Sequence, residues 1–168
     1  PRRTPLAEAM DQHLPIRPGT EPFLLLGILV ATVKGGGVDQ QFVSDYVHDY
    51  DRLESVLTPW SVEQCAEICG LDAPAISGVA LKFSRAAMAV AHPGPNTFNN
   101  AHGSLGAWAW MALHTVTANL LRPGGQYESR GVFDLFEAIS MVPSSGAPHT
   151  RAADHPLTCL LYTSPSPR

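Results

Sequence analysis

The chain has 168 residues, a length typical of one domain. Hydrophobic residues make up 45% of it, enough for a core, and charged residues only 15%, against roughly 25% in an average soluble domain. The net charge of −4 argues against a clustered basic face, so we expect no nucleic-acid partner. The low charge also indicates a surface that other parts of a larger protein cover, and the start in mid-motif without Met agrees with a piece of such a protein.

The first third of the chain predicts two helices and a short strand between them. Residues 6–13 are typical of a short helix, and residues 13–16 of a short strand. Pro22 suits the first turn of the next helix, where its missing N–H costs nothing. Residues 23–33 are almost all apolar, so we expect this helix, over 21–34, to be buried on all sides. The run is shorter than the roughly 20 residues of a membrane span, and we expect no direct membrane span.

Further helices with identifiable ends follow. Asp39 can cap a helix, and residues 51–57 continue in a helical pattern. Ser61 and Gln64 fit a capping box, and Gly70 ends that helix. Another helix, which begins near residue 73, comes next.

Two of the three cysteines, Cys65 and Cys69, are four residues apart and share one helix face. We interpret them as small buried hydrophobes. A metal pair is the alternative, but the chain lacks a second pair at zinc-like spacing, so we predict no metal ligand.

The remaining elements predict the fold class. Residues 87–91 are apolar and uncharged, which favours a buried parallel strand, and a long helix follows over about 100–121. Beyond it we expect only a turn of helix near 133–139. Alternating helix and strand predicts an α/β fold, a partial Rossmann-like parallel sheet with flanking helices. We assign 1–125 to this partial domain, 126–157 to an irregular connecting segment, and 158–168, with Cys159, to a non-native tail that resembles a sequencing-adaptor read-through.

The first candidate site is the arginine pair Arg2 and Arg3, which would follow a strand that the chain lacks. Guanidinium groups at such a position can bind phosphate bidentately. Two solvated surface arginines are the alternative.

The second candidate is the turn Gly19-Thr20-Glu21 at the start of the apolar helix. Glycine lets backbone approach a ligand closely, Thr20 can cap, and a helix N-terminus attracts anions. The Glu21 carboxylate can accept both N–H donors on the Watson–Crick edge of a guanine. A helix cap without a ligand is the alternative.

The third candidate is the loop after residues 87–91, where glycines and polar side chains gather at Gly94, Asn96, Asn100 and His102. In a doubly wound fold such a loop faces the ligand. His102 can donate a hydrogen bond or act as a general acid, and packing or capping is its alternative role. We assign no catalytic residue, because no nucleophile triad, Walker loop or dinucleotide fingerprint is present in the chain.

Together these segments resemble the molybdopterin oxidoreductase family, which includes dimethyl sulfoxide reductase and formate dehydrogenases. The resemblance rests on the order and spacing of four motifs: Pro1-Arg2-Arg3-Thr4, Arg17-Pro18-Gly19-Thr20-Glu21, Thr117-Ala118-Asn119 and Arg122-Pro123-Gly124-Gly125. Two departures stand out. Glu21 occupies a position where the family usually has Asp, and Ala118 one where it usually has Gly.

The resemblance implies an internal fragment of an enzyme that uses molybdopterin guanine dinucleotide with Mo or W. The parent would catalyse a two-electron oxidation or reduction of a small-molecule or inorganic substrate, with electron-transfer subunits as partners. The metal ligand and any iron–sulfur cluster would lie upstream, so we expect the fragment alone to be inactive. A non-catalytic iron–sulfur subunit of a respiratory complex with the same fold, and an unrelated nucleotide-binding α/β domain, are the alternatives.

Overall fold

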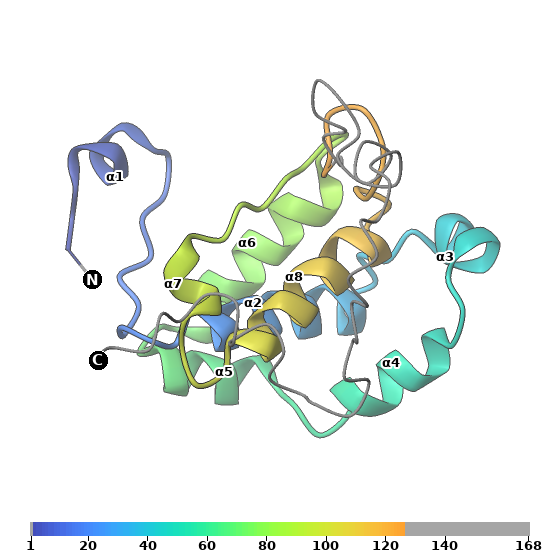
Figure 1. Ribbon diagram of the computed structural model, residues 1–168, viewed down its shortest axis with the longest axis horizontal. Helices are drawn as coiled ribbons and strands as arrows, with labels where there is room; N and C mark the ends of the chain where they lie inside the picture. The colour runs from blue at the N-terminus through green and yellow to red at the C-terminus, as the bar shows by residue number, and fades with distance from the viewer. Residues whose placement is uncertain (1, 127–168) are drawn as a thin grey trace, which may run out of the picture. The chain divides into compact units, whose positions relative to one another are not determined.

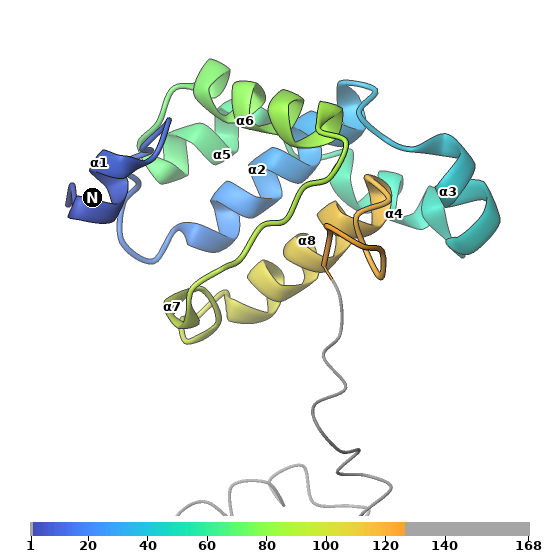
Figure 2. The ribbon, with the colours of Figure 1, turned by 90° about the horizontal axis from the view of Figure 1, so that it is seen from above.

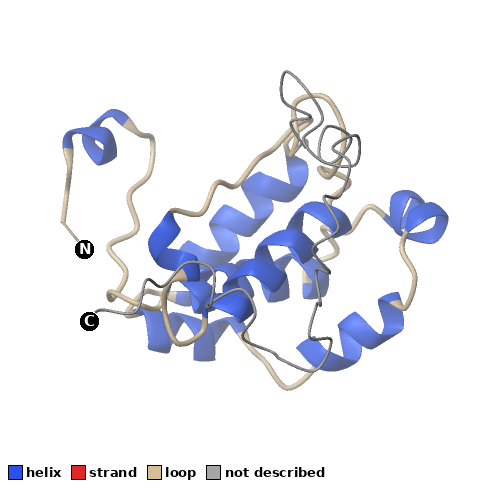
Figure 3. Ribbon diagram, viewed as in Figure 1, coloured by secondary structure: helices blue, strands red, loops and turns tan. Residues whose placement is uncertain are grey.

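The computed structural model describes residues 2–126, all of which belong to the first of the chain's two units. These residues form helices and turns, with no strand among them (Figure 3). The helices are α1 (Pro5–Ala9), α2 (Glu21–Lys34), α3 (Gln40–Tyr46), α4 (Tyr50–Leu57), α5 (Val62–Cys69), α6 (Ala73–Arg85), α7 (Pro95–Phe98) and α8 (Gly103–Val116).

Helix α2 is the centre of the packed helices, with α5, α6 and α8 against it (Figures 1 and 2). Leu26, Leu29 and Val30 are at most 1% exposed. A helix that is apolar around its whole circumference must bury every side, and three neighbours do so here. The expected burial of this helix is confirmed for its interior, from residue 26 to 30.

Three helix ends predicted from local chemistry are confirmed, whereas the predicted Thr20 side-chain cap of α2 is not formed. The Asp39 carboxylate accepts a hydrogen bond from the N–H of Phe42 at 2.9 Å and caps α3. Ser61 and Gln64 form the reciprocal capping box at the start of α5. Gly70, with φ +73°, ends α5 in the left-handed conformation that glycine adopts readily.

Cys65 and Cys69 are fully buried free thiols between α5 and its neighbours, as expected for small hydrophobes. Burial raises the pKa of the Cys65 thiol to about 11, and the nearby Cys69 adds to the rise. Within residues 2–126 no three His, Cys, Asp or Glu side chains gather into a group that could hold a metal ion.

The predicted parallel sheet is wrong for the part of the chain that the structure describes. Residues 13–16 have no regular structure, and residues 87–91 run between α6 and α7 with no backbone partner among residues 2–126. Side chains from α8 and the turn after it bind this second segment instead: the N–H groups of Ala89 and Ala91 donate to Asn119 and His114. The only bridge described is the isolated pair Leu120 and Gln126.

The end of the long helix differs from the prediction, and the predictions for the C-terminal part of the chain are not tested. Helix α8 ends at Val116, earlier than expected, because Ala118 turns the chain with φ +55°. The connecting segment beyond residue 126, the helical turn near 133–139 and the tail 158–168 with Cys159 lie outside the described residues. No helix among the described residues is long and apolar enough to cross a membrane.

Candidate functional site

The turn before α2 is anchored to the end of α5 through Arg17. Its Nη1 donates to the carbonyl oxygens of Glu67 at 2.7 Å and Ile68 at 3.3 Å. Its backbone N–H donates to the carbonyl oxygen of Cys69 at 2.9 Å. A cation at a helix C-terminus satisfies carbonyls that have no partner within the helix. Arg17 therefore fixes this turn in place, a role that the sequence did not reveal.

Gly19 and Thr20 complete the turn. Gly19 has φ +81°, and no atom of the structure lies within 4 Å of the position that a Cβ would take. The turn therefore needs the positive φ that glycine adopts readily, and the space beside the chain at this position is open. The Thr20 hydroxyl donates to the carbonyl of Arg17 at 2.6 Å, so it stabilises the turn and makes no side-chain cap of α2.

The side chain of Glu21 has a buried oxygen without a partner. Its Oε2 is shielded from solvent, and no donor among the described residues reaches it. Burial raises the pKa of the neighbouring Cys69 thiol, and the Glu21 carboxylate adds to that rise. A buried acceptor without a donor costs roughly 1–3 kcal/mol, so a ligand that brought N–H groups to Oε2 would recover that free energy.

The loop that carries the third candidate is closed by Asn100. Its side-chain nitrogen donates to the carbonyls of Asn96 and Thr97, both at 3.1 Å, and its side-chain oxygen accepts from the N–H of His102 at 2.8 Å. Asn100 therefore shapes the loop, while the side chain of Asn96 is exposed. At the start of the loop Gly94 is exposed, and a Cβ added to it would have no atom within 4 Å.

The loop and the α2 turn lie next to each other. The rings of His102 and Phe23 meet edge-on with 5.0 Å between their centroids. A Cβ on Gly106 would lie 3.3 Å from the Cβ of Pro22, so α8 comes close to the first turn of α2. The structure thus brings together the second and third candidate segments, although they are some 80 residues apart in sequence.

Arg2 and Arg3 lie elsewhere in the chain, immediately before α1. Both are exposed, and Thr4 caps α1 by accepting the N–H of Ala7 at 3.3 Å. No hydrogen bond or ion pair among residues 2–126 joins either arginine to Glu21. Their shared role with Glu21 stays a prediction.

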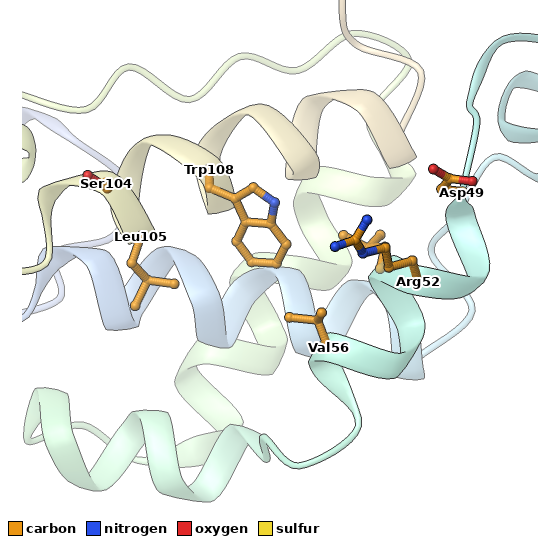
Figure 4. A pocket seen from close by; sticks show the side chains of 7 residues that line it. Asp49, Arg52, Val56, Ser104, Leu105 and Trp108 are labelled. Atoms are coloured by element: carbon orange, nitrogen blue, oxygen red, sulfur yellow. The ribbon is translucent and has the colours of Figure 1, made fainter. Parts of the chain in front are cut away.

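A cavity of about 630 Å³ between α4 and α8 contains none of the predicted site residues. Figure 4 shows the Arg52 guanidinium directed toward the Trp108 ring, with Val56 and Leu105 beside them. Nothing in the described chain indicates what fills it.

A second cavity, of about 430 Å³, lies where the C-terminal ends of α2, α6 and α8 meet. Gly36, Ser84, Arg85 and Arg122 contribute to its lining. Helix C-termini carry partial negative charge, which the two arginines offset.

No family model matches the chain, but its curated relatives and a solved structure indicate one family. It is 30% identical over 119 residues to the menaquinone reductase molybdopterin-binding-like subunit of Nitratidesulfovibrio vulgaris, covering 71% of this chain and 16% of that protein. It is 28% identical over 150 residues to the F420-dependent formate dehydrogenase 2 subunit alpha of Methanococcus maripaludis, covering 85% and 22%.

Among solved structures, acetylene hydratase from Pelobacter acetylenicus superposes with a TM-score of 0.69 at 25% identity, over 73% of this chain and 17% of that one. The chain belongs to the molybdopterin oxidoreductase family. It spans only 16 to 22% of the length of these relatives. The relatives also differ in the reactions that their names state, so membership alone does not determine the reaction.

Proposed function

We propose that this chain is a segment of a Mo- or W-dependent enzyme that catalyses a two-electron oxidation or reduction, and that it helps to bind one arm of molybdopterin guanine dinucleotide. The bound metal would supply the redox chemistry. The chain itself would hold the nucleotide end of the cofactor, through Gly19, Thr20 and Glu21 with the adjoining loop from Gly94 to His102.

The observation that carries this proposal is the buried, unpartnered Oε2 of Glu21. A guanine offers two adjacent N–H donors on its Watson–Crick edge, and a carboxylate accepts two such bonds. The open space beside Gly19 supports close approach of a ligand to the same turn. These two features fit the group, and Thr20 makes no side-chain cap of α2.

Exposed apolar side chains support a segment that a larger protein covers. Leu6, Tyr46, Met88 and Val90 are each more than half exposed. Single exposed apolar residues are common, but these four together with Met10 and Leu121, on a chain with 15% charge, favour contact with further protein. We expect electron-transfer subunits to be partners of the whole protein, and the name of one relative, a subunit, agrees with this.

Retention of the cofactor by full-length variants tests the proposal. Glu21→Ala removes the carboxylate, and Glu8→Ala removes an equal charge from the exposed face of α1 as the control. Loss of two charge-assisted hydrogen bonds should weaken binding by about 3 kcal/mol, so guanine and metal contents should fall in Glu21→Ala alone. Unchanged guanine and metal contents in Glu21→Ala would refute the role of Glu21.

A second candidate function is a non-catalytic subunit of the same fold, favoured by the words "molybdopterin-binding-like" in the name of one relative. Metal analysis of the full-length wild-type protein separates the two. An enzyme should contain about one Mo or W per chain, whereas a non-catalytic subunit should contain neither.

A further inference from the structure

Residues 87–91 are held by side chains in a pattern that repeats at every second residue. The N–H of Ala89 donates to Oδ1 of Asn119 at 3.1 Å, and the N–H of Ala91 donates to Nε2 of His114 at 3.0 Å. The carbonyl of Ala91 accepts from the indole N–H of Trp110 at 2.7 Å, and that of Ala87 accepts from Arg122 at 3.2 Å. These side chains therefore hold the segment at Ala87, Ala89 and Ala91.

The two acceptors are themselves fixed in orientation. His114 is fully buried, and its Nδ1 lies 2.8 Å from the carbonyl of Trp110. A carbonyl can only accept, so Nδ1 carries the proton and Nε2 is free to accept from Ala91. Asn119 is 2% exposed, and its Nδ2 donates to the Thr117 hydroxyl at 3.1 Å, which directs Oδ1 toward Ala89.

Packing adds to this orientation. The His114 ring meets the Phe83 ring at 86° and the Trp110 ring at 75°, with centroids 5.5 and 5.6 Å apart. Helices α6 and α8 therefore hold the imidazole between them, and it cannot rotate without disturbing both rings. Residues 87–91 have no other backbone hydrogen bond among residues 2–126.

We propose that His114 and Asn119 are positioning residues: by binding the N–H groups of Ala91 and Ala89, they set where the loop from Gly94 to His102 begins. The end of that loop is fixed independently by the start of α8. The role of this loop in cofactor binding rests on the proposed function. The hydrogen bonds that hold residues 87–91 do not depend on it. The alternative is that His114 and Asn119 only fill space in the core.

Hydrogen exchange of single amides in the full-length protein separates these roles. His114→Phe keeps an aromatic ring and removes the acceptor, while His114→Gln restores one. We expect exchange at Ala91 to rise about tenfold or more in His114→Phe and to return most of the way in His114→Gln. Exchange at Ala89 should likewise rise about tenfold or more in Asn119→Leu, which removes the acceptor of that amide. Thr115→Ala, on α8 beside His114, is the control and should change neither amide.

Equal exchange at Ala91 in His114→Phe and His114→Gln would overturn the proposal. It would show that the hydrogen-bond acceptor at position 114 does not protect this amide, and that His114 acts only through packing. Guanine content, measured on the same samples, tests the proposed function separately. Faster exchange with unchanged guanine content would support positioning by His114 and Asn119 and contradict a role of the loop in cofactor binding.

Discussion

The ring of His102 packs edge-on against the ring of Phe23, with 5.0 Å between their centroids. Phe23 lies two residues after Glu21, and His102 comes just before α8. This contact therefore joins the two candidate segments that the described part of the chain brings together. The contact shows the His102 ring packed against Phe23, in line with the packing alternative for this residue.

Replacing Phe23 with Leu should loosen the loop without unfolding α2. Leucine keeps the contact of this half-buried side chain with the core but removes its aromatic pairs with His102 and with Trp60, each worth about 0.5–1.5 kcal/mol. Hydrogen exchange of residues 94–102 in the full-length protein should rise about threefold to tenfold, with no change at Leu29. Faster exchange across α2 as well would show that the loss is one of core packing and not of this contact.

Two glycines should respond in opposite directions to alanine. A Cβ on Gly103 would lie 2.0 Å from the carbonyl oxygen of Phe98, so the backbone must move, and Gly103→Ala should destabilise the start of α8 by about 3 kcal/mol. Gly78, inside α6, has open space around it, and Gly78→Ala should stabilise that helix by about 0.5–1 kcal/mol. Opening free energies from hydrogen exchange of α8 and α6 measure both effects. A destabilising Gly78→Ala would contradict the open surface seen here.

His114 should make the local stability of residues 87–91 depend on pH. Burial lowers the pKa of His114 below its ordinary value of 6.5, although the carbonyl of Trp110 partly opposes this. The neutral form is thus favoured when folded, and the unfolded chain takes up a proton first as the pH falls. Stability is fully present above about pH 6.5 and decreases below it, by at most about 1.4 kcal/mol per pH unit.

Hydrogen exchange at Ala91, corrected for its intrinsic pH dependence, measures this effect. Protection should decline below pH 6.5 in the wild-type protein and stay level in His114→Gln. The described ring and hydrogen-bond partners of His114 are uncharged, namely Phe83, Trp110 and the backbone of Ala91, so no described ion pair should mask the decline. The same decline in His114→Gln would assign it to another group.

Local chemistry was enough to predict most helix ends. Asp39, Ser61 and Gly70 act within three residues of the backbone groups that they satisfy, so their roles are readable from the sequence. The fold class failed for the opposite reason. A short apolar run such as 87–91 does not reveal what its backbone will bind, and here the partners are side chains 23 and 30 residues away.

The candidate site shows the same division. Glycine at position 19 was interpretable, because a turn before a helix calls for it. The anchoring of Arg17 at the end of α5, 50 residues on, was not. The unpartnered oxygen of Glu21 was also beyond the sequence, because burial depends on elements packed from elsewhere in the chain.

A structure of the full-length protein with its cofactor bound would measure the distance from the Glu21 carboxylate to the guanine base. We expect N1 and N2 of the guanine to lie about 2.7–3.0 Å from the two carboxylate oxygens. A guanine bound elsewhere, with Oε2 of Glu21 contacting only protein, would contradict this expectation.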